Sequence, residues 1–202
     1  MDTIAAYLPV LTIGWVMLGW VAFAAVFLFR QRSPATQVRK MDRRSLIGIA
    51  LQSIAYVLVW SVRRPFPSPL LGRSPILDIA VALATAALVV FSIWLVASAV
   101  HTLGKQWSLA ARVVEDHQLI VAGPYRIVRH PIYSGMGGIL IATGVALSHP
   151  LAIIVALVVF AIGTFNRTRI EERLLTEQFG STYAAYAAKV PALIPRPWQK
   201  PS

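Results

Sequence analysis

Hydrophobic residues occur in four long blocks along this chain, and short polar clusters separate them. The blocks cover residues 4–29, 46–62, 76–100 and 136–165. Strands of an outer-membrane barrel would alternate apolar and polar residues, so continuous blocks predict membrane helices instead. A bilayer core needs about 20 helical residues at about 1.5 Å each. The first and third blocks are therefore long enough to span, and the 17-residue second block is short but workable.

The fourth block is interrupted at 148-SHP-150, which could be a kink in one span or the tip of a hairpin. Segments 30–44, 101–135 and 166–202 hold six, four and six of the 19 Lys and Arg residues, and segment 63–75 holds three. A hairpin places sixteen of them on one side, whereas a single span divides them ten to nine. Because basic residues gather on the cytoplasmic side, we predict a hairpin, five membrane segments and an N-terminus outside.

Composition agrees with a single all-α integral membrane domain over residues 1–202. The chain is 57% hydrophobic and has no cysteine, which removes disulfides, thiolate metal sites and a cysteine nucleophile. The net charge of +11 is explained by topology, and no aromatic-basic platform or groove-reading helix accompanies it, so we expect no nucleic-acid partner. His101, His117 and His130 do not form a metal-ligand set, so no metal is expected.

The first polar cluster whose side chains could bind a ligand or take part in a reaction is 123-GPYRIVRHPIYSG-135. Gly123 and Pro124 favour a turn, and Pro131 biases His130 away from helix, so the segment is predicted to be a rigid loop. Its tyrosine rings suit a planar base or a cation, and its arginines and histidine suit a carboxylate or phosphate. The alternative is a juxtamembrane anchor at the headgroup level, with Arg126 the best candidate for that role and Arg129 ambiguous between the two.

The second polar cluster is 166-NRTRIEERLL-175, which should continue as a helix to Phe179 and stop at Gly180. Arg167 and Glu171 are four residues apart and share a helix face, whereas Glu171 and Glu172 point about 100° apart, so at most one should face a given site. The alternative is an exposed helix with weak ion pairs. Because the hairpin brings both clusters to one membrane face, we expect a shared site there.

Together these motifs resemble a known family. The stretch 117-HQLIVAGPYRIVRHPIYSG-135, a hairpin-length apolar run and 167-RTRIEERLLTEQFGSTYAAYAAKVPALIP-195 are similar to the isoprenylcysteine carboxyl methyltransferases. More broadly, they resemble the membrane methyltransferases that include phospholipid N-methyltransferases. The resemblance covers roughly residues 101–198, so residues 76–202 are expected to form a catalytic core and residues 1–75 two peripheral spans.

The resemblance implies S-adenosylmethionine as methyl donor, bound in a cytoplasm-facing pocket built from the loop before the hairpin and the C-terminal helix. It implies catalytic roles for Arg167, Glu171 and His130, with Arg167 holding the substrate carboxylate. The expected cofactor contacts are His117, Gln118, Leu119, Ile120, Tyr125, His130, Pro131, Tyr133 and Glu171. The chain would reside in an inner, plasma or ER-type membrane.

The expected reaction is methyl transfer to a lipid-like acceptor that enters from the bilayer, most simply the carboxylate of an isoprenylcysteine. A carboxylate needs no general base, whereas an amine or thiol must lose a proton to His130 or a glutamate. Phosphatidylethanolamine N-methylation and methylation of a small hydrophobic thiol are therefore alternatives. An NADPH-dependent sterol-type reductase, similar around Phe179, Gly180 and Tyr183, and a non-catalytic membrane protein are the other two.

Overall fold

The computed structural model describes residues 2–29, 38–41, 43–65, 68, 74–104, 112–114 and 118–195. Within these residues the chain folds into α1 (Asp2–Leu28), β1 (Val38–Met41), α2 (Ser45–Ser61), α3 (Pro75–Leu103), β2 (Arg112–Val114), the 3-10 helix η2 (Gly123–Arg126), α4 (Pro131–Leu147), α5 (Pro150–Phe179) and α6 (Ser181–Lys189). The predicted apolar blocks are thus confirmed as helices. A small antiparallel pair, β1 with β2, adds to the predicted all-α fold.

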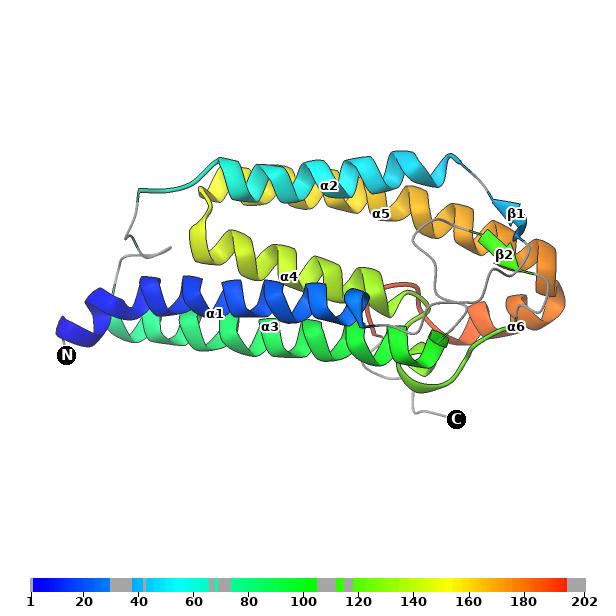
Figure 1. The fold of residues 1–202 in the computed structure, drawn as a ribbon, viewed down its shortest axis with the longest axis horizontal. Helices are drawn as coiled ribbons and strands as arrows, with labels where there is room; N and C mark the ends of the chain where they lie inside the picture. The colour runs from blue at the N-terminus through cyan, green and yellow to red at the C-terminus, as the bar shows by residue number, and fades with distance from the viewer. Residues whose placement is uncertain are drawn as a thin grey trace.

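The long helices form a bundle with α4 in the middle (Figure 1). Helices α1 and α3 lie side by side on one side of α4, and α2 and α5 lie side by side on the other. Val16, Val89 and Ile139 form a buried cluster between α1, α3 and α4. A second cluster includes Ala55 and Phe160, between α2, α4 and α5. Helix α4 therefore holds the two outer pairs together.

The predicted break in the fourth apolar block is confirmed as the tip of a helical hairpin. Helix α4 ends at Leu147, and α5 begins at Pro150 and runs back antiparallel to α4 (Figure 1). The His149 side chain caps α5 by accepting a hydrogen bond from the Leu151 amide at 3.3 Å. The Arg64 guanidinium donates to the carbonyls of Val145, Ala146 and Ser148 at the end of α4. The loop after α2 thus fixes the hairpin tip.

Helix α4 begins earlier than the sequence analysis expected. The rigid loop was predicted to run from residue 123 to 135, but Pro131 occupies the first turn of α4, so residues 131–135 are helical. Proline suits this position because the first helical N–H groups have no partner within the helix. His130, with φ of −126° and ψ of 60°, lies just outside the helix as expected. The predicted loop therefore ends at His130 instead of residue 135.

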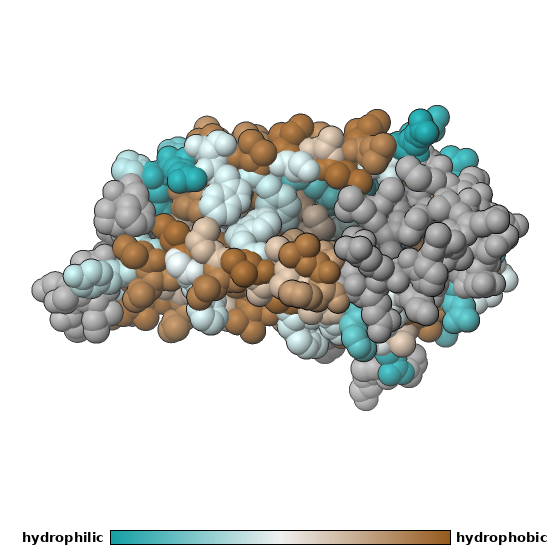
Figure 2. All heavy atoms as spheres, viewed as in Figure 1, coloured by the Kyte–Doolittle hydropathy of each residue, from teal (hydrophilic) through white to brown (hydrophobic). Residues whose placement is uncertain are grey.

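The surface agrees with a bilayer environment. Figure 2 shows mainly hydrophobic side chains along the helices of the visible face and hydrophilic ones near the ends. Helices α1, α3 and α5 are long and apolar enough to cross a membrane, while α2 and α4, with 17 residues each, are shorter. The protein is an integral membrane protein. Crossing by all five helices, and the orientation of the bundle, stay predictions.

Candidate functional site

The two polar clusters meet where α5 extends beyond α4, beside η2 and α6 (Figure 1). The C-terminal segment after α6 runs along the residues that precede α4. The amide of Arg129 donates to the Pro191 carbonyl at 2.8 Å, and the amide of His130 donates to the Ala192 carbonyl at 2.9 Å. These backbone hydrogen bonds hold His130 at the start of α4, facing α5.

His130 lies between two carboxylates of α5. Its Nδ1 is 3.6 Å from Glu171 Oε2, and its Nε2 is 3.0 Å from Glu172 Oε1. Burial alone would lower the pKa of His130, but hydrogen bonds and attraction to both glutamates raise it above its ordinary value. The expectation that at most one glutamate faces the site is wrong, because the imidazole contacts one carboxylate with each ring nitrogen.

Tyr133, Arg167 and Glu171 form the inner part of the site. The Tyr133 hydroxyl donates to Glu171, and the Tyr133 ring stacks on His130 with centroids 5.8 Å apart. The Arg167 guanidinium carbon lies 4.8 Å from the centroid of the Tyr133 ring, and Arg167 Nη2 lies 3.7 Å from Glu171 Oε1. The predicted shared face of Arg167 and Glu171 is confirmed. One turn of α4 and one turn of α5 therefore share a connected set of charged and aromatic groups.

Helix α2 adds a residue that the sequence analysis missed. Arg167 Nη1 donates to Gln52 Oε1 at 3.2 Å, and both side chains are buried. A signal for Gln52 exists in the sequence, since it is the amide side chain within an otherwise apolar block. A buried amide in a membrane helix needs partners, but the sequence does not say which ones.

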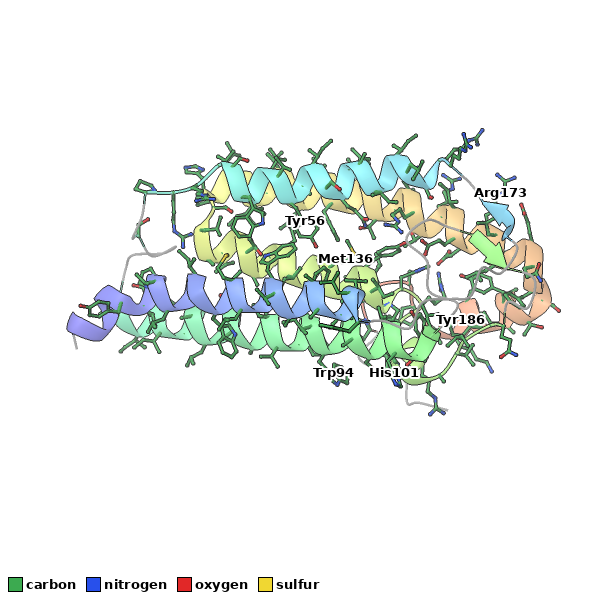
Figure 3. The ribbon with its side chains drawn as sticks, viewed as in Figure 1. Tyr56, Trp94, His101, Met136, Arg173 and Tyr186 are labelled. Carbon is green, nitrogen blue, oxygen red and sulfur yellow. The ribbon has the colours of Figure 1, made fainter. Side chains whose placement is uncertain are left out.

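Arg129 has an internal role. Its guanidinium donates to Glu172 Oε1 through Nε at 3.0 Å and Nη2 at 2.6 Å, and through Nη1 to the carbonyls of Ala187 and Val190. The arginine thus connects α5 with the end of α6. Arg126, in contrast, is exposed, as suits a headgroup-facing charge. Arg173, labelled in Figure 3, forms an exposed pair with Glu177 at 3.0 Å near the end of α5.

The remaining predicted cofactor residues precede or flank this set. Tyr125 is buried in η2, and its carbonyl accepts a hydrogen bond from the Tyr186 hydroxyl at 2.7 Å. Burial, then Glu171 and Tyr186, raise the pKa of Tyr125. Pro131 is fully buried. The segment 118–120 lies before η2, with Gln118 exposed and Leu119 and Ile120 half-buried, and His117 lies outside the described residues.

Taken together, the fold and the site define a helical membrane protein whose buried charged residues gather at one end of an apolar bundle. Residues 80–182, half of the chain, match the family model described as phospholipid methyltransferase. The chain belongs to the phospholipid methyltransferase family. Among the residues described, no group of His, Asp or Glu side chains has an arrangement that could hold a metal ion.

Curated relatives point to the same group. Protein-S-isoprenylcysteine O-methyltransferase B of Arabidopsis thaliana is 35% identical over 100 residues, which are 48% of this chain and 51% of that protein. The protein-S-isoprenylcysteine O-methyltransferase of Saccharomyces cerevisiae is 34% identical over 99 residues, 48% of this chain and 41% of the relative. The chain thus spans about half the length of the curated relatives it matches. The resemblance to the isoprenylcysteine carboxyl methyltransferases is confirmed.

Proposed function

We propose that this protein methylates the carboxylate of a lipid-like, isoprenylcysteine-type acceptor, with S-adenosylmethionine as methyl donor. One observation carries the proposal: Arg167, only 5% exposed, lies at the polar end of an apolar bundle. Buried charge next to a membrane is costly and usually functional. The names of the curated relatives, protein-S-isoprenylcysteine O-methyltransferases, support the same acceptor.

The residues present suit S-adenosylmethionine, which carries a sulfonium, an ammonium and a carboxylate. Glu171 and Glu172, whose side chains are 24% and 29% exposed, supply the negative charge that would attract a cationic ligand. Tyr125, His130, Pro131 and Tyr133 would line the cofactor site, together with the segment 117–120. When bound, the cofactor supplies an electrophilic methyl group.

The task left to the protein is alignment in a site with little water. An arginine presents N–H donors in a planar fork that matches the two oxygens of a carboxylate. Arg167 would hold the acceptor in this way, and a carboxylate can attack a methyl group without first losing a proton. Glu171, 3.7 Å from Arg167, links the acceptor group to the cofactor side of the site.

The surroundings of His130 favour a carboxylate acceptor over an amine or a thiol, which need a proton acceptor. Both ring nitrogens of His130 lie beside carboxylates, and these neighbours raise its pKa. With a carboxylate beside each ring nitrogen, neither nitrogen of His130 presents a free lone pair to an amine or a thiol in this arrangement. We therefore assign His130 to holding the two glutamates in place.

The membrane explains how two unlike ligands reach one site. The acceptor would enter from the bilayer between helices, and the soluble cofactor would enter from the cytoplasm, with the N-terminus of the chain outside. Residues 76–202 would supply the catalytic core. The chain would reside in an inner, plasma or ER-type membrane.

The experiment is a labelled-methyl transfer assay on purified full-length protein in lipid nanodiscs. Farnesylcysteine, phosphatidylethanolamine and a hydrophobic thiol are offered in parallel with methyl-labelled S-adenosylmethionine. We expect label on farnesylcysteine that mild base releases as methanol, because a methyl ester is base-labile. Label on phosphatidylethanolamine or on the thiol would replace the carboxylate acceptor, and binding of NADPH without transfer would refute the methyltransferase proposal.

A further inference from the structure

Gln52 is a buried polar residue in the apolar helix α2, with 2% of its surface exposed. Neither the substrate nor the cofactor assignment above uses it, and the family match at residues 80–182 does not include α2. Burying an amide away from water costs free energy unless its donor and acceptor are both satisfied. The partners of Gln52 therefore indicate why a polar side chain occupies this position.

Both ends of the Gln52 amide have a partner on α5. Nε2 donates to Thr164 Oγ1 at 2.9 Å, and Oε1 accepts from Arg167 Nη1 at 3.2 Å. A guanidinium carries only donors, so the amide oxygen has to be the atom that faces Arg167. Thr164, one turn earlier on the same helix, then holds the nitrogen. Turning the amide over would point its NH2 group at the guanidinium and break the hydrogen bond to Arg167, so the amide oxygen stays directed at the arginine.

The backbones of α2 and α5 also come unusually close beside Arg167. A Cβ atom added to Gly48 would lie 2.7 Å from the Gly163 carbonyl oxygen and 3.2 Å from Arg167 Cδ. A Cβ atom added to Gly163 would lie 2.9 Å from the Gly48 carbonyl oxygen. Two facing glycines thus allow the stem of Arg167 to lie against α2. Helix α2 therefore both makes space for the arginine and supplies the group that orients it.

An uncharged partner suits this task. Gln52 orients the guanidinium without adding a second negative charge to that of Glu171, which lies 3.7 Å from Arg167 Nη2. A carboxylate in the same place would hold the arginine as firmly but would compete with an acceptor carboxylate for the same charge.

We propose that Gln52 is a positioning residue that sets the guanidinium of Arg167 for the carboxylate of the acceptor. This inference rests on the proposed function. It assigns part of the specificity for a carboxylate to α2, a helix outside the region shared with the family.

The test compares how tightly the full-length protein in nanodiscs binds farnesylcysteine and farnesylcysteine amide, which differ only at the carboxyl group. Wild-type protein should bind the acid about 10-fold or more tightly than the amide, as expected for hydrogen bonds to a charged group. Gln52→Leu and Gln52→Glu should reduce this preference to roughly threefold or less, on the same scale. The matched control is Ser53→Ala, because Ser53 is exposed and its hydroxyl donates only to its own helix, at the Ile49 carbonyl.

The ratio separates positioning from a general structural role. If the Gln52 variants weaken binding of acid and amide equally, or leave the preference intact, the positioning role is refuted while the proposed function stands. If wild-type protein itself shows no preference for the acid, the carboxylate proposal fails and the role of Gln52 fails with it. Should Gln52→Leu not fold, Gln52→Met decides, since it also removes the amide oxygen that faces Arg167 and keeps an unbranched side chain of similar length.

Discussion

The close approach of α2 and α5 predicts that Gly48 cannot become alanine without cost. In a helix interior, a change from glycine to alanine ordinarily stabilises by roughly 0.5–1 kcal/mol. At Gly48 the new methyl group would lie 2.7 Å from the Gly163 carbonyl oxygen and would overlap the stem of Arg167. A backbone carbonyl cannot swing aside as a flexible side chain can, so the two helices would have to separate.

The expected magnitude follows from overpacking, which typically costs about 1–3 kcal/mol. At about 2–4 °C per kcal/mol for a chain of this size, Gly48→Ala should lower the unfolding midpoint by roughly 2–12 °C. The acceptor KM should rise as well, because Arg167 is displaced. The assay is thermal unfolding in one detergent, together with acceptor titration at saturating S-adenosylmethionine.

Gly14→Ala is the matched control, because no heavy atom lies within 4 Å of a Cβ atom built there. It should leave the midpoint unchanged or raise it slightly. If Gly48→Ala is as stable as Gly14→Ala and keeps the same acceptor KM, α2 and α5 do not approach each other as described, and the account of Arg167 is refuted.

Three further changes test other parts of the site and bundle. Because the pKa of His130 is raised in the folded protein, the charged imidazole stabilises the fold fully below about pH 6.5, and this contribution is lost as pH rises through the higher folded pKa. The unfolding midpoint of the wild-type protein should therefore fall over that pH range, and the midpoint of His130→Gln should fall less. Equal pH profiles for the two proteins would contradict this. Arg129→Leu should loosen the segment after α6 and speed tryptic cleavage at Lys189, because the Val190 carbonyl loses its donor. Unchanged cleavage would argue against the role of Arg129 in holding this segment. Arg64→Met should lower the free energy of unfolding by about 1–3 kcal/mol, because carbonyls at the end of α4 lose their donor. The affinity for the cofactor should not change. A variant as stable as the wild-type protein would contradict the capping role.

The sequence predicts the helices well, because each long apolar run indicates a helix that lies in an apolar environment. The hairpin also follows from local information, namely Pro150 and the distribution of basic residues. The start of α4 is less predictable, since proline marks either a loop or the first turn of a helix, and Pro131 here occupies the first turn. The pair of short strands gives no comparable signal.

The site is harder to predict because its contacts join residues far apart in the chain. Gln52 and Arg167 are separated by 115 positions, and nothing in either local pattern specifies that α2 packs on α5. The two glutamates show a second limit. Their 100° separation on the helix is a sound expectation, yet an imidazole placed between them contacts both. Which groups converge therefore depends on tertiary packing, even when the residue types are evident.

Aromatic contacts make the same point in the middle of the bundle. Figure 3 shows Tyr56 on α2 and Met136 on α4 close together, and the Tyr56 hydroxyl donates to the Met136 carbonyl at 2.9 Å. Trp20 of α1 stacks edge-on against Tyr56 and donates to Thr143 at 3.0 Å. The Tyr56 hydroxyl and the Trp20 indole N–H thus help to specify how α1 and α2 pack on α4. The sequence shows these two residues only as aromatic residues within apolar blocks.

The central claim is that Arg167 holds an acceptor carboxylate while the cofactor is bound by neighbouring residues. The most direct measurement is the rate of base-labile methyl incorporation into farnesylcysteine by wild-type protein and by Arg167→Met, with S-adenosylmethionine affinity measured on the same samples. We predict that the substitution lowers the rate about 100-fold or more, as for loss of a group that orients a reactant, while cofactor affinity changes little. A variant that methylates farnesylcysteine at the wild-type rate would contradict the account.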